Sequence, residues 1–176
     1  MDARSQKILN VKIEHKDKIK LVGKLLKTSF QDGRHAKEIF PFFHSIVVNR
    51  DMETVSSRKN LDQYFVFKMT PGSKDFDYLI GVEVEDEDES RIPEGMVSWV
   101  LEAQDYATMT FIKRGNHDVM AVFQYIAESW LPQSGFKSAG APGFVFCRDP
   151  FFTVYKKYGF EGNPVADAFF AIEKIQ

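Results

Sequence analysis

The chain has 176 residues, of which 44% are hydrophobic, and its formal net charge is −2 at pH 7. This length favours one domain or two tightly fused half-domains, and the near-neutral charge argues against a dedicated nucleic-acid-binding protein. A single cysteine excludes a disulfide framework, and no apolar run approaches the ~20 residues that a membrane-spanning helix needs. Residues 1–7 are polar and lack the apolar core of an export signal, so we expect a cytoplasmic protein.

Residues 11–48 show first a strand pattern and then a helix pattern. Apolar and polar side chains alternate over 11–26, which predicts one long strand or two short ones. Gly23 inside this pattern indicates a bulge or a close approach of another backbone. Apolar residues recur at helical spacing over 34–48, and Pro41 among them predicts that the helix begins there, with the proline in its first turn.

Two further strands are predicted in the first half of the chain. Residues 64–69 and 78–84 have strand patterns and are separated by a Pro-Gly turn at 71–72. The acidic stretch that follows, 85–89, lacks the glycine and the alternating spacing of a calcium-binding loop. We therefore interpret it as a solvated connection between two halves.

The second half of the chain repeats the order of the first. Residues 96–112 are strand-like, and residues 116–130 carry an apolar stripe at helical spacing. A short strand is predicted over 144–147 and a closing strand over 168–175. The second half therefore reads strand, helix, strand, strand, like the first.

A short identical segment accompanies this repeated order. The triplet Phe-Val-Phe at 65–67, followed by Pro71, returns at 144–146, followed by Pro150. We predict an α+β fold of two β-α-β-β units, about 8–86 and 96–176, which form a single domain over 1–176. The units are expected to be related by pseudo-twofold symmetry, with antiparallel sheets forming a central cleft and helices on the outer side. Because ligand sites favour such interfaces, the cleft is the predicted site.

Several segments of the second half resemble a known family. The segments IPEG at 92–95, EAQDYA at 102–107 and WLPQSGF at 130–136, together with Gly115, are similar to the GyrI-like small-molecule-binding domain. The same module is the effector-binding part of some AraC-type and MerR-type transcription regulators. The resemblance covers nearly the whole chain and implies two β-α-β-β units around a cleft that binds hydrophobic, often cationic, compounds. Because few residues precede the first predicted strand, we expect a standalone version without a helix-turn-helix segment.

One position departs from the family pattern. The resemblance implies a glutamate in the short strand after the WLPQSGF segment, facing the cleft, but Val145 takes that position here. Cys147 shares the face of Val145, since side chains alternate along a strand. A neutral site loses the charge attraction that is strong at low dielectric. We therefore predict a cleft suited to neutral or aromatic ligands, with Asp167 as a substitute carboxylate.

The predicted ligand site combines stacking surfaces, an apolar floor and one charge. The stacking residues are Tyr64, Trp99 and Phe111, the floor residues are Val66, Val145 and Cys147, and the charged residue is Asp167. The histidines show no metal-like spacing, so no metal is expected, and no bound cofactor or catalytic residue is predicted. Because no His or Lys lies near Cys147 in sequence to lower its pKa, we interpret it as a buried, inert thiol.

The predicted function is reversible binding of a small, apolar or aromatic organic molecule. One alternative is a hydrolase that detoxifies strained or electrophilic small molecules, which would require a carboxylate or histidine in the cleft. A second alternative is a protein-interaction module, such as a gyrase inhibitor or a separate effector subunit of a transcription regulator. An exposed apolar patch away from the cleft would favour it. We expect no direct contact with nucleic acid or membrane. The sequence is compatible with a protein partner or with a homodimer.

Overall fold

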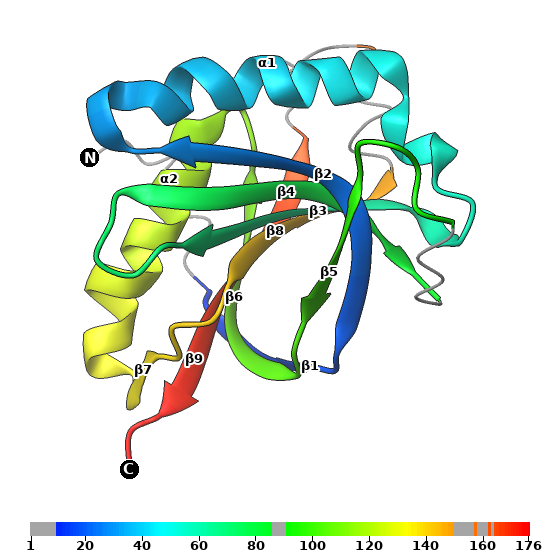
Figure 1. Cartoon of the computed structure of the whole chain (residues 1–176). Coiled ribbons are helices and arrows are strands. Elements are labelled where there is room, and N and C mark those ends of the chain that lie inside the picture. Colours follow the sequence, from blue (N-terminus) through cyan, green and yellow to red (C-terminus); the bar gives the residue numbers. More distant parts are fainter. Residues whose placement is uncertain (1–9, 86–90, 150–156, 158–161, 163) are drawn as a thin grey trace.

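The computed structural model describes residues 10–85, 91–149, 157, 162 and 164–176. These residues form one antiparallel sheet of nine strands and two α-helices, α1 (Arg34–Asn49) and α2 (Asn116–Tyr125). The sheet is strongly curled, and both helices lie on its outer side (Figure 1). This arrangement confirms the predicted α+β fold with antiparallel strands and external helices.

The strand order shows the duplication directly. The strands are β1 (Lys12–Lys16), β2 (Ile19–Ser29), β3 (Arg58–Met69), β4 (Asp75–Val84), β5 (Val97–Leu101), β6 (Gln104–Ile112), β7 (Phe136–Ser138), β8 (Gly143–Cys147) and β9 (Val165–Lys174). They follow the order β1-β6-β9-β8-β3-β4-β2-β5, and β7 pairs with β9. The units β2-α1-β3-β4 and β6-α2-β8-β9 therefore meet at the central pair β3–β8, which confirms the repeated β-α-β-β order.

The two halves exchange their edge strands. Strand β1 precedes β2 in the chain but pairs with β6 of the second half. Strand β5 precedes β6 but pairs with β2 of the first half. Residues 11–26, predicted as one long strand or two short ones, form two strands, and the strand-like stretch 96–112 is also divided in two. In each case the two parts pair with different neighbours. The exchange ties each half to the opposite edge of the sheet.

The register of β3 and β8 corrects the interpretation of the repeated Phe-Val-Phe triplet. Phe65 pairs with Val145, and Val66 pairs with Phe144. Cross-strand partners share a face of the sheet, so Phe65 and Val145 lie on one face and Val66 and Phe144 on the other. Phe65, the first residue of one triplet, and Phe144, the first residue of the other, therefore point to opposite faces of the sheet. Corresponding letters of the triplets are therefore not corresponding positions in the fold.

Helix α1 begins seven residues earlier than the proline predicts. It follows Gly33, whose φ of 64° is left-handed, and it continues through Pro41, which lies inside the helix on its exposed side. A proline inside a helix costs ~3 kcal/mol because it removes a backbone hydrogen bond. Burial of Ile39, Phe43 and Ile46 against the sheet offsets this cost.

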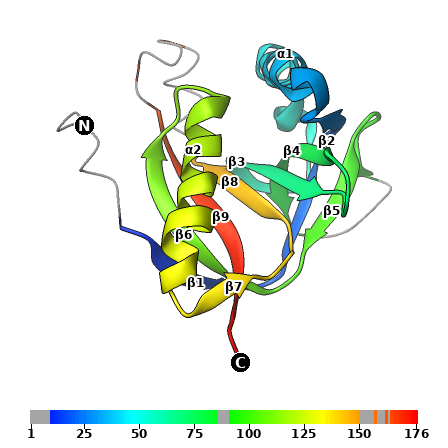
Figure 2. The same ribbon diagram turned by 90° about the vertical axis from the view of Figure 1, so that its left-hand side faces the viewer.

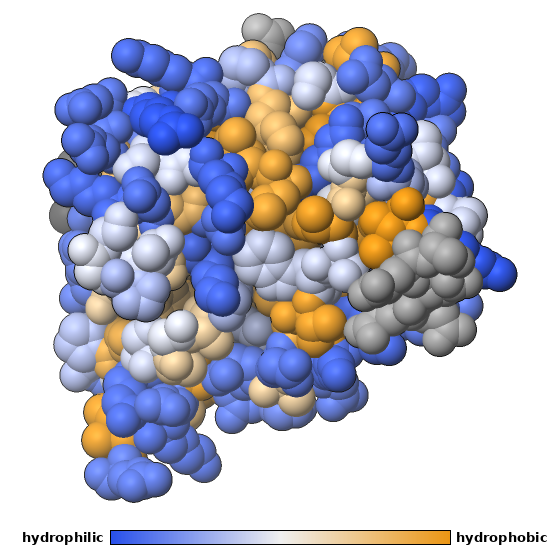
Figure 3. Space-filling view, viewed as in Figure 1, coloured by the Kyte–Doolittle hydropathy of each residue, from blue (hydrophilic) through white to orange (hydrophobic). Residues whose placement is uncertain are grey.

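Each face of the sheet carries an apolar cluster. On one face, residues of α1 and α2 pack against β3, β4, β6, β8 and β9. Helices α1 and α2 lie apart on this face, and strands β3 and β8 are visible between them (Figure 2). On the other face, the buried residues of a second cluster lie on strands. Figure 3 shows apolar side chains gathered in the middle of the molecule, with hydrophilic ones around the margin.

Some of the sequence predictions concern segments outside the described part of the chain. Pro150 and most of the acidic stretch 85–89 lie there. Within the described residues, no helix has the length and apolar character needed to cross a membrane. Nor do His, Cys, Asp and Glu side chains of these residues form a cluster of three or more suited to a metal ion.

Candidate functional site

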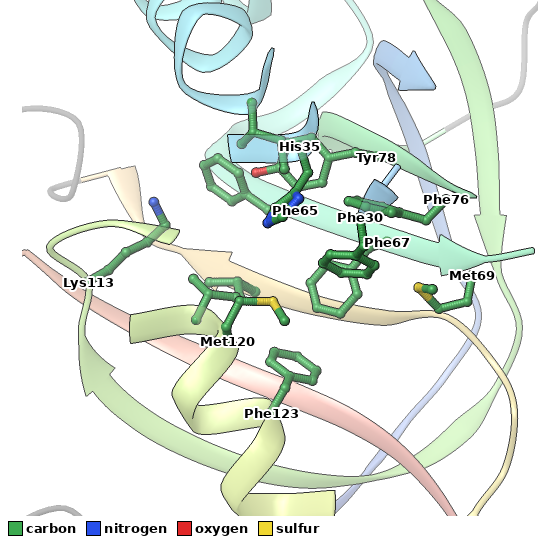
Figure 4. Close-up of a pocket in the computed structure, with 13 residues that line it drawn as sticks. Phe30, His35, Phe65, Phe67, Met69, Phe76, Tyr78, Lys113, Met120 and Phe123 are labelled. Carbon is green, nitrogen blue, oxygen red and sulfur yellow. The ribbon is translucent and has the colours of Figure 1, made fainter. Parts of the chain in front are cut away.

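A pocket of about 270 Å³ lies between α1 and α2 on the helix-covered face of the sheet (Figure 4). Its lining residues are Phe30, His35, Ile39, Phe65, Phe67, Met69, Phe76, Tyr78, Lys113, Val119, Met120, Phe123 and Val145. Both halves of the chain contribute to the pocket. The lining residues from Phe30 to Tyr78 belong to the first β-α-β-β unit, and those from Lys113 to Val145 belong to the second. The pocket therefore lies at the junction of the two units.

Aromatic rings form most of the pocket wall and support one another. Phe30 stacks on Phe76 with 4.7 Å between ring centroids, and it meets the ring of His35 edge-on at the same distance. Phe67 from β3 and Phe123 from α2 form another edge-on pair at 4.7 Å. Such pairs are favourable arrangements of aromatic rings. The wall is therefore held in place by contacts between rings, and it bridges the two units.

The pocket has an open end and a closed end. Met69 and Met120 each expose 46% of their surface, whereas Phe65 and Val145 expose 2% and 1%. Figure 4 shows Lys113 at the end opposite to Met69. Both methionines therefore border solvent, where their flexible side chains adapt to different shapes. Phe65 and Val145 form the buried floor, and the buried Lys113 marks the closed end opposite to Met69.

The lining also includes Lys113, a buried basic residue whose amine packs against aromatic rings. It is 4% exposed, and its Nζ lies 5.2 Å from the ring centroids of both Phe43 and Phe65. Burial lowers the pKa of the Lys113 amine, and electrostatic interactions with Cys147 and Asp118 oppose this shift. The backbone N–H of Lys113 donates to the carbonyl oxygen of Pro164 at 2.8 Å, which fixes the chain just beyond β6.

Two further side chains in the lining carry polar atoms. Nδ1 of His35 is buried and has no hydrogen-bond partner among the described residues. Burial raises the pKa of the Tyr78 hydroxyl well above its usual value, so this group stays protonated. Apart from His35, Tyr78 and Lys113, the lining consists of hydrocarbon and thioether side chains. Such a surface favours an apolar ligand and orients it through few polar contacts.

A family model accounts for nearly the whole of this structure. The model of the Cass2 family, described as integron-associated effector binding protein, matches residues 12–171. The chain belongs to the Cass2 family. This assignment confirms the resemblance to GyrI-like effector-binding domains indicated by the sequence segments. No curated protein matches the chain in sequence.

Solved structures with the fold of this Cass2-family chain include three informative relatives. SAV2435 bound to tetraphenylphosphonium has a TM-score of 0.71 at 12% sequence identity, covering 94% of both chains. An integron cassette protein from Vibrio cholerae has a TM-score of 0.62 at 12% identity, covering 94% of this chain and 97% of that chain. The C-terminal domain of EcmrR has a TM-score of 0.60 at 12% identity, covering 97% of this chain and all of that domain. At these identities the similarities show the shared fold.

The Cass2-family structure separates the residues of the predicted site. Val145 lines the floor of the pocket. Phe111 and Cys147 lie in the core of the same face but outside the lining. Tyr64, Val66 and Trp99 belong to the cluster on the opposite face. The predicted floor of Val66, Val145 and Cys147 does not lie on one surface, because Val66 pairs with Phe144 and both point away from the helices.

Asp167 also lies away from the pocket. It pairs with Thr110 of β6, whose hydroxyl donates to Oδ1 of Asp167 at 2.5 Å. Nη1 of Arg148 lies 3.6 Å from the other carboxylate oxygen of Asp167. Because Asp167 is cross-strand partner to Phe146, it shares the face of the second cluster. It is therefore not a substitute for a pocket carboxylate, and the charged side chain in the described lining is Lys113.

Sequence reasoning missed Lys113, Phe65 and Phe67 as site residues. A usable signal exists for Lys113, because continuing the alternation of β6 by two residues from Phe111 places Lys113 on the same face. For Phe65 and Phe67 the deciding fact is the register between β3 and β8, and a shift of one residue exchanges the two faces. That register depends on pairing between residues far apart in the chain.

Proposed function

We propose that this Cass2-family protein reversibly binds a small, largely apolar organic molecule in the pocket between α1 and α2, with both halves of the chain acting as one binding unit. The observation that carries the proposal is the pocket itself, which is walled by aromatic rings from both units. Its volume of about 270 Å³ is near the lower limit of the ~300–1,000 Å³ typical of small-molecule sites. A molecule with one ring and a short chain suits this size.

The family and the fold support a binding role. The family consists of integron-associated effector-binding proteins, and the structure of SAV2435, which has the same fold, holds the organic ion tetraphenylphosphonium. The sequence identity to SAV2435 is 12%, so its ligand is not transferred to this chain. What the comparison supports is a role for this fold in binding a small organic compound.

A hydrolase is the less favoured function. Hydrolysis requires a group that activates water next to the bound substrate. Asp167, the carboxylate considered for that task, lies on the opposite face of the sheet and is engaged by Thr110. His35 lines the pocket, but its ring packs edge-on against Phe30, and the described lining holds no carboxylate to orient it as a base. We therefore propose binding without catalysis.

A matched pair of substitutions tests the location of the site. Phe67 and Phe146 are both half-buried aromatic residues on the central strands, but Phe67 lines the pocket and Phe146 lies on the other face. Calorimetric titration with neutral alkylbenzenes and phenyl alcohols should show binding to the native chain. Phe67→Ala should weaken this binding about tenfold, since a lost aromatic contact is worth roughly 1 kcal/mol or more.

The control variant Phe146→Ala should keep the native affinity while losing a similar amount of thermal stability. Equal losses of affinity in both variants would show that the effect arises from general loosening of the fold. An effect of Phe146→Ala alone would place the ligand on the opposite face and refute the proposed site.

A further inference from the structure

We propose that the ligand site continues from the pocket between α1 and α2, the main pocket, past Phe67 and Phe123 into a second hollow. The protein then takes an elongated amphiphile, an aryl-alkyl or alkyl chain with one polar group at its outer end and its apolar end innermost. This inference rests on the proposed function, because it names the class of molecule that the same pocket takes. The continuity of the two hollows and the difference between their linings carry the inference.

The second hollow adjoins the main pocket directly. It has a volume of about 310 Å³ and is bordered by the end of β3, by α2, by β9 and by the connection between β7 and β8. It shares Phe67, Met69 and Phe123 with the main pocket. Figure 4 shows Phe123 and Met69 on the side of the main pocket away from Lys113. A ligand that fills the main pocket therefore reaches the second hollow along the three shared residues.

Gly143 leaves room for the rings at the border of the two hollows. It is the cross-strand partner of Phe67. A Cβ added at Gly143 would lie 2.9 Å from Cε1 of Phe123 and 3.2 Å from Cε2 of Phe67. Because glycine has no Cβ, the two rings pack edge-on at the start of β8 with 4.7 Å between their centroids. The border therefore includes rings on rotatable side-chain bonds, which small rotations adapt to a passing alkyl chain.

The two hollows differ in their contact with water. Phe65 and Val145 in the main pocket are 2% and 1% exposed. In the second hollow, Ser138, Gly140 and Ala141 are exposed. A polar group buried without a hydrogen-bond partner costs free energy, whereas a polar group that stays in water does not. The polar end of a ligand is therefore expected at the second hollow, and the apolar end in the main pocket.

Phenylalkanols of increasing length test the inference on the full chain. The probes are 2-phenylethanol, 4-phenylbutan-1-ol and 8-phenyloctan-1-ol, titrated calorimetrically below the concentrations at which they aggregate. Each methylene moved from water into an apolar site contributes up to about fourfold in affinity. We therefore expect 8-phenyloctan-1-ol to bind about tenfold or more tightly than 4-phenylbutan-1-ol.

Filling the second hollow should remove this dependence on chain length. Ser138 is exposed and pairs with Ile172 of the helix-covered face, so Ser138→Phe places a ring in the hollow without displacing a core residue. Oγ of Ser138 accepts the backbone N–H of Gly140 at 3.3 Å, and Ala141→Phe is a second variant that keeps this hydrogen bond. In either variant the advantage of 8-phenyloctan-1-ol over 4-phenylbutan-1-ol should fall to about twofold or less. Binding of 2-phenylethanol reports that the main pocket is intact.

Lys137→Phe is the matched control for these variants. Lys137 precedes Ser138 on β7 and pairs with Glu173, so its side chain points to the opposite face of the sheet. The substitution adds the same ring to the same strand, at a residue outside the lining of both hollows. The advantage of the long alcohol should therefore persist in Lys137→Phe.

A probe with a hydroxyl at each end tests the orientation of the ligand. In 8-(4-hydroxyphenyl)octan-1-ol, one hydroxyl has to enter the main pocket whichever end is innermost. Because a buried hydroxyl without a partner is costly, this probe should bind about tenfold or more weakly than 8-phenyloctan-1-ol. Equal affinities of the two probes would overturn the inference.

The outcomes separate this inference from the proposed function. If the native chain binds the shorter alcohols and gains no affinity with length, the inference is overturned while the binding function stands. The same conclusion follows if Ser138→Phe and Ala141→Phe keep the length dependence, or if Lys137→Phe loses it equally. If the native chain binds none of the alcohols, the proposed function fails, and the inference fails with it.

Discussion

Nζ of Lys113 lies 5.2 Å from the centroid of the Phe65 ring, so a basic group from the end of β6 meets an aromatic ring of β3 at the closed end of the pocket. The contact joins the two β-α-β-β units. The ring stabilises the charged amine, but burial disfavours it more, because the pKa of Lys113 is lowered from 10.5. The buried amine of Lys113 is therefore a cost to the stability of the fold.

Replacing Lys113 by methionine should stabilise the unliganded protein. Because the pKa is lower in the folded than in the unfolded chain, the unfolded chain binds more protons between the two values, and stability rises with pH in that interval. At neutral pH, Lys113→Met should increase the free energy of unfolding by about 1–3 kcal/mol. The gain should shrink as pH approaches the unfolded-state lysine pKa of about 10.4.

Urea denaturation of both proteins at a series of pH values measures this gain. Other titrating groups are common to the two proteins and cancel in the difference. A gain that is constant with pH would show that shape, not charge, is responsible, and a loss of stability would contradict the prediction.

A glutamate at Val145 should give the pocket a preference for cationic ligands. Val145 lies on the floor and is 1% exposed, so Val145→Glu introduces a carboxylate in a region of low dielectric. Binding of 4-phenylbutylamine should increase about tenfold over the native chain, and binding of 4-phenylbutyrate should weaken. Val145→Gln, of similar size and without charge, is the control, and both variants are compared by calorimetric titration. Equal ligand preferences in the two variants would contradict an electrostatic origin.

Cys147 should be unreactive in the folded protein. Its side chain is fully buried, and burial raises the pKa of the thiol to about 12, against the lowering effect of Lys113. Thiolate is the reactive species, so a colorimetric disulfide reagent should react very slowly near neutral pH and rapidly once urea unfolds the chain. Cys147→Ser provides the blank. Rapid reaction of the native chain would show that the pocket side of β8 opens readily.

The sequence predicts the parts of this fold that depend on local patterns. The two amphipathic helices, the strands around them and the repeated β-α-β-β order are visible as helical spacing or alternation, as in residues 116–130 and 78–84. The start of α1 is wrong by seven residues because burial of Ile39 and Phe43 outweighs the local preference of Pro41 for the first turn. Local patterns are therefore reliable except where tertiary packing overrides them.

The candidate site depends on long-range pairing, which local patterns do not contain. Alternation shows that Phe65 and Val66 point in opposite directions, but pairing of Phe65 with Val145 decides which of them faces the helices. The exchange of β1 and β5 between halves is likewise set by partners distant in the chain. For this reason Val145 was predictable as a lining residue from the family resemblance, whereas Phe65 and Phe67 were not.

Gly23 should be required for the close packing of β2 on β4. It pairs with Gly81, and a Cβ added at Gly23 would lie 2.1 Å from the backbone oxygen of Ile80 and 2.4 Å from the Cα of Gly81. Backbone atoms cannot move aside as a side chain can, so Gly23→Ala should lower the free energy of unfolding by about 3 kcal/mol or more. The close approach predicted at this glycine is present, and it occurs where β2 also pairs with β5.

Gly115→Ala is the matched control for this prediction. A Cβ at Gly115 would lie 3.0 Å from Nδ1 of His117, a largely exposed side chain that is free to rotate away. Its effect on the free energy of unfolding, measured by urea denaturation, should be within about 0.5 kcal/mol, as for most surface substitutions. Similar midpoints for the two variants would mean that β2 shifts away from β4 at little cost. In that case the curl of the sheet, and with it the position of α1 over the pocket, would not depend on the glycine pair.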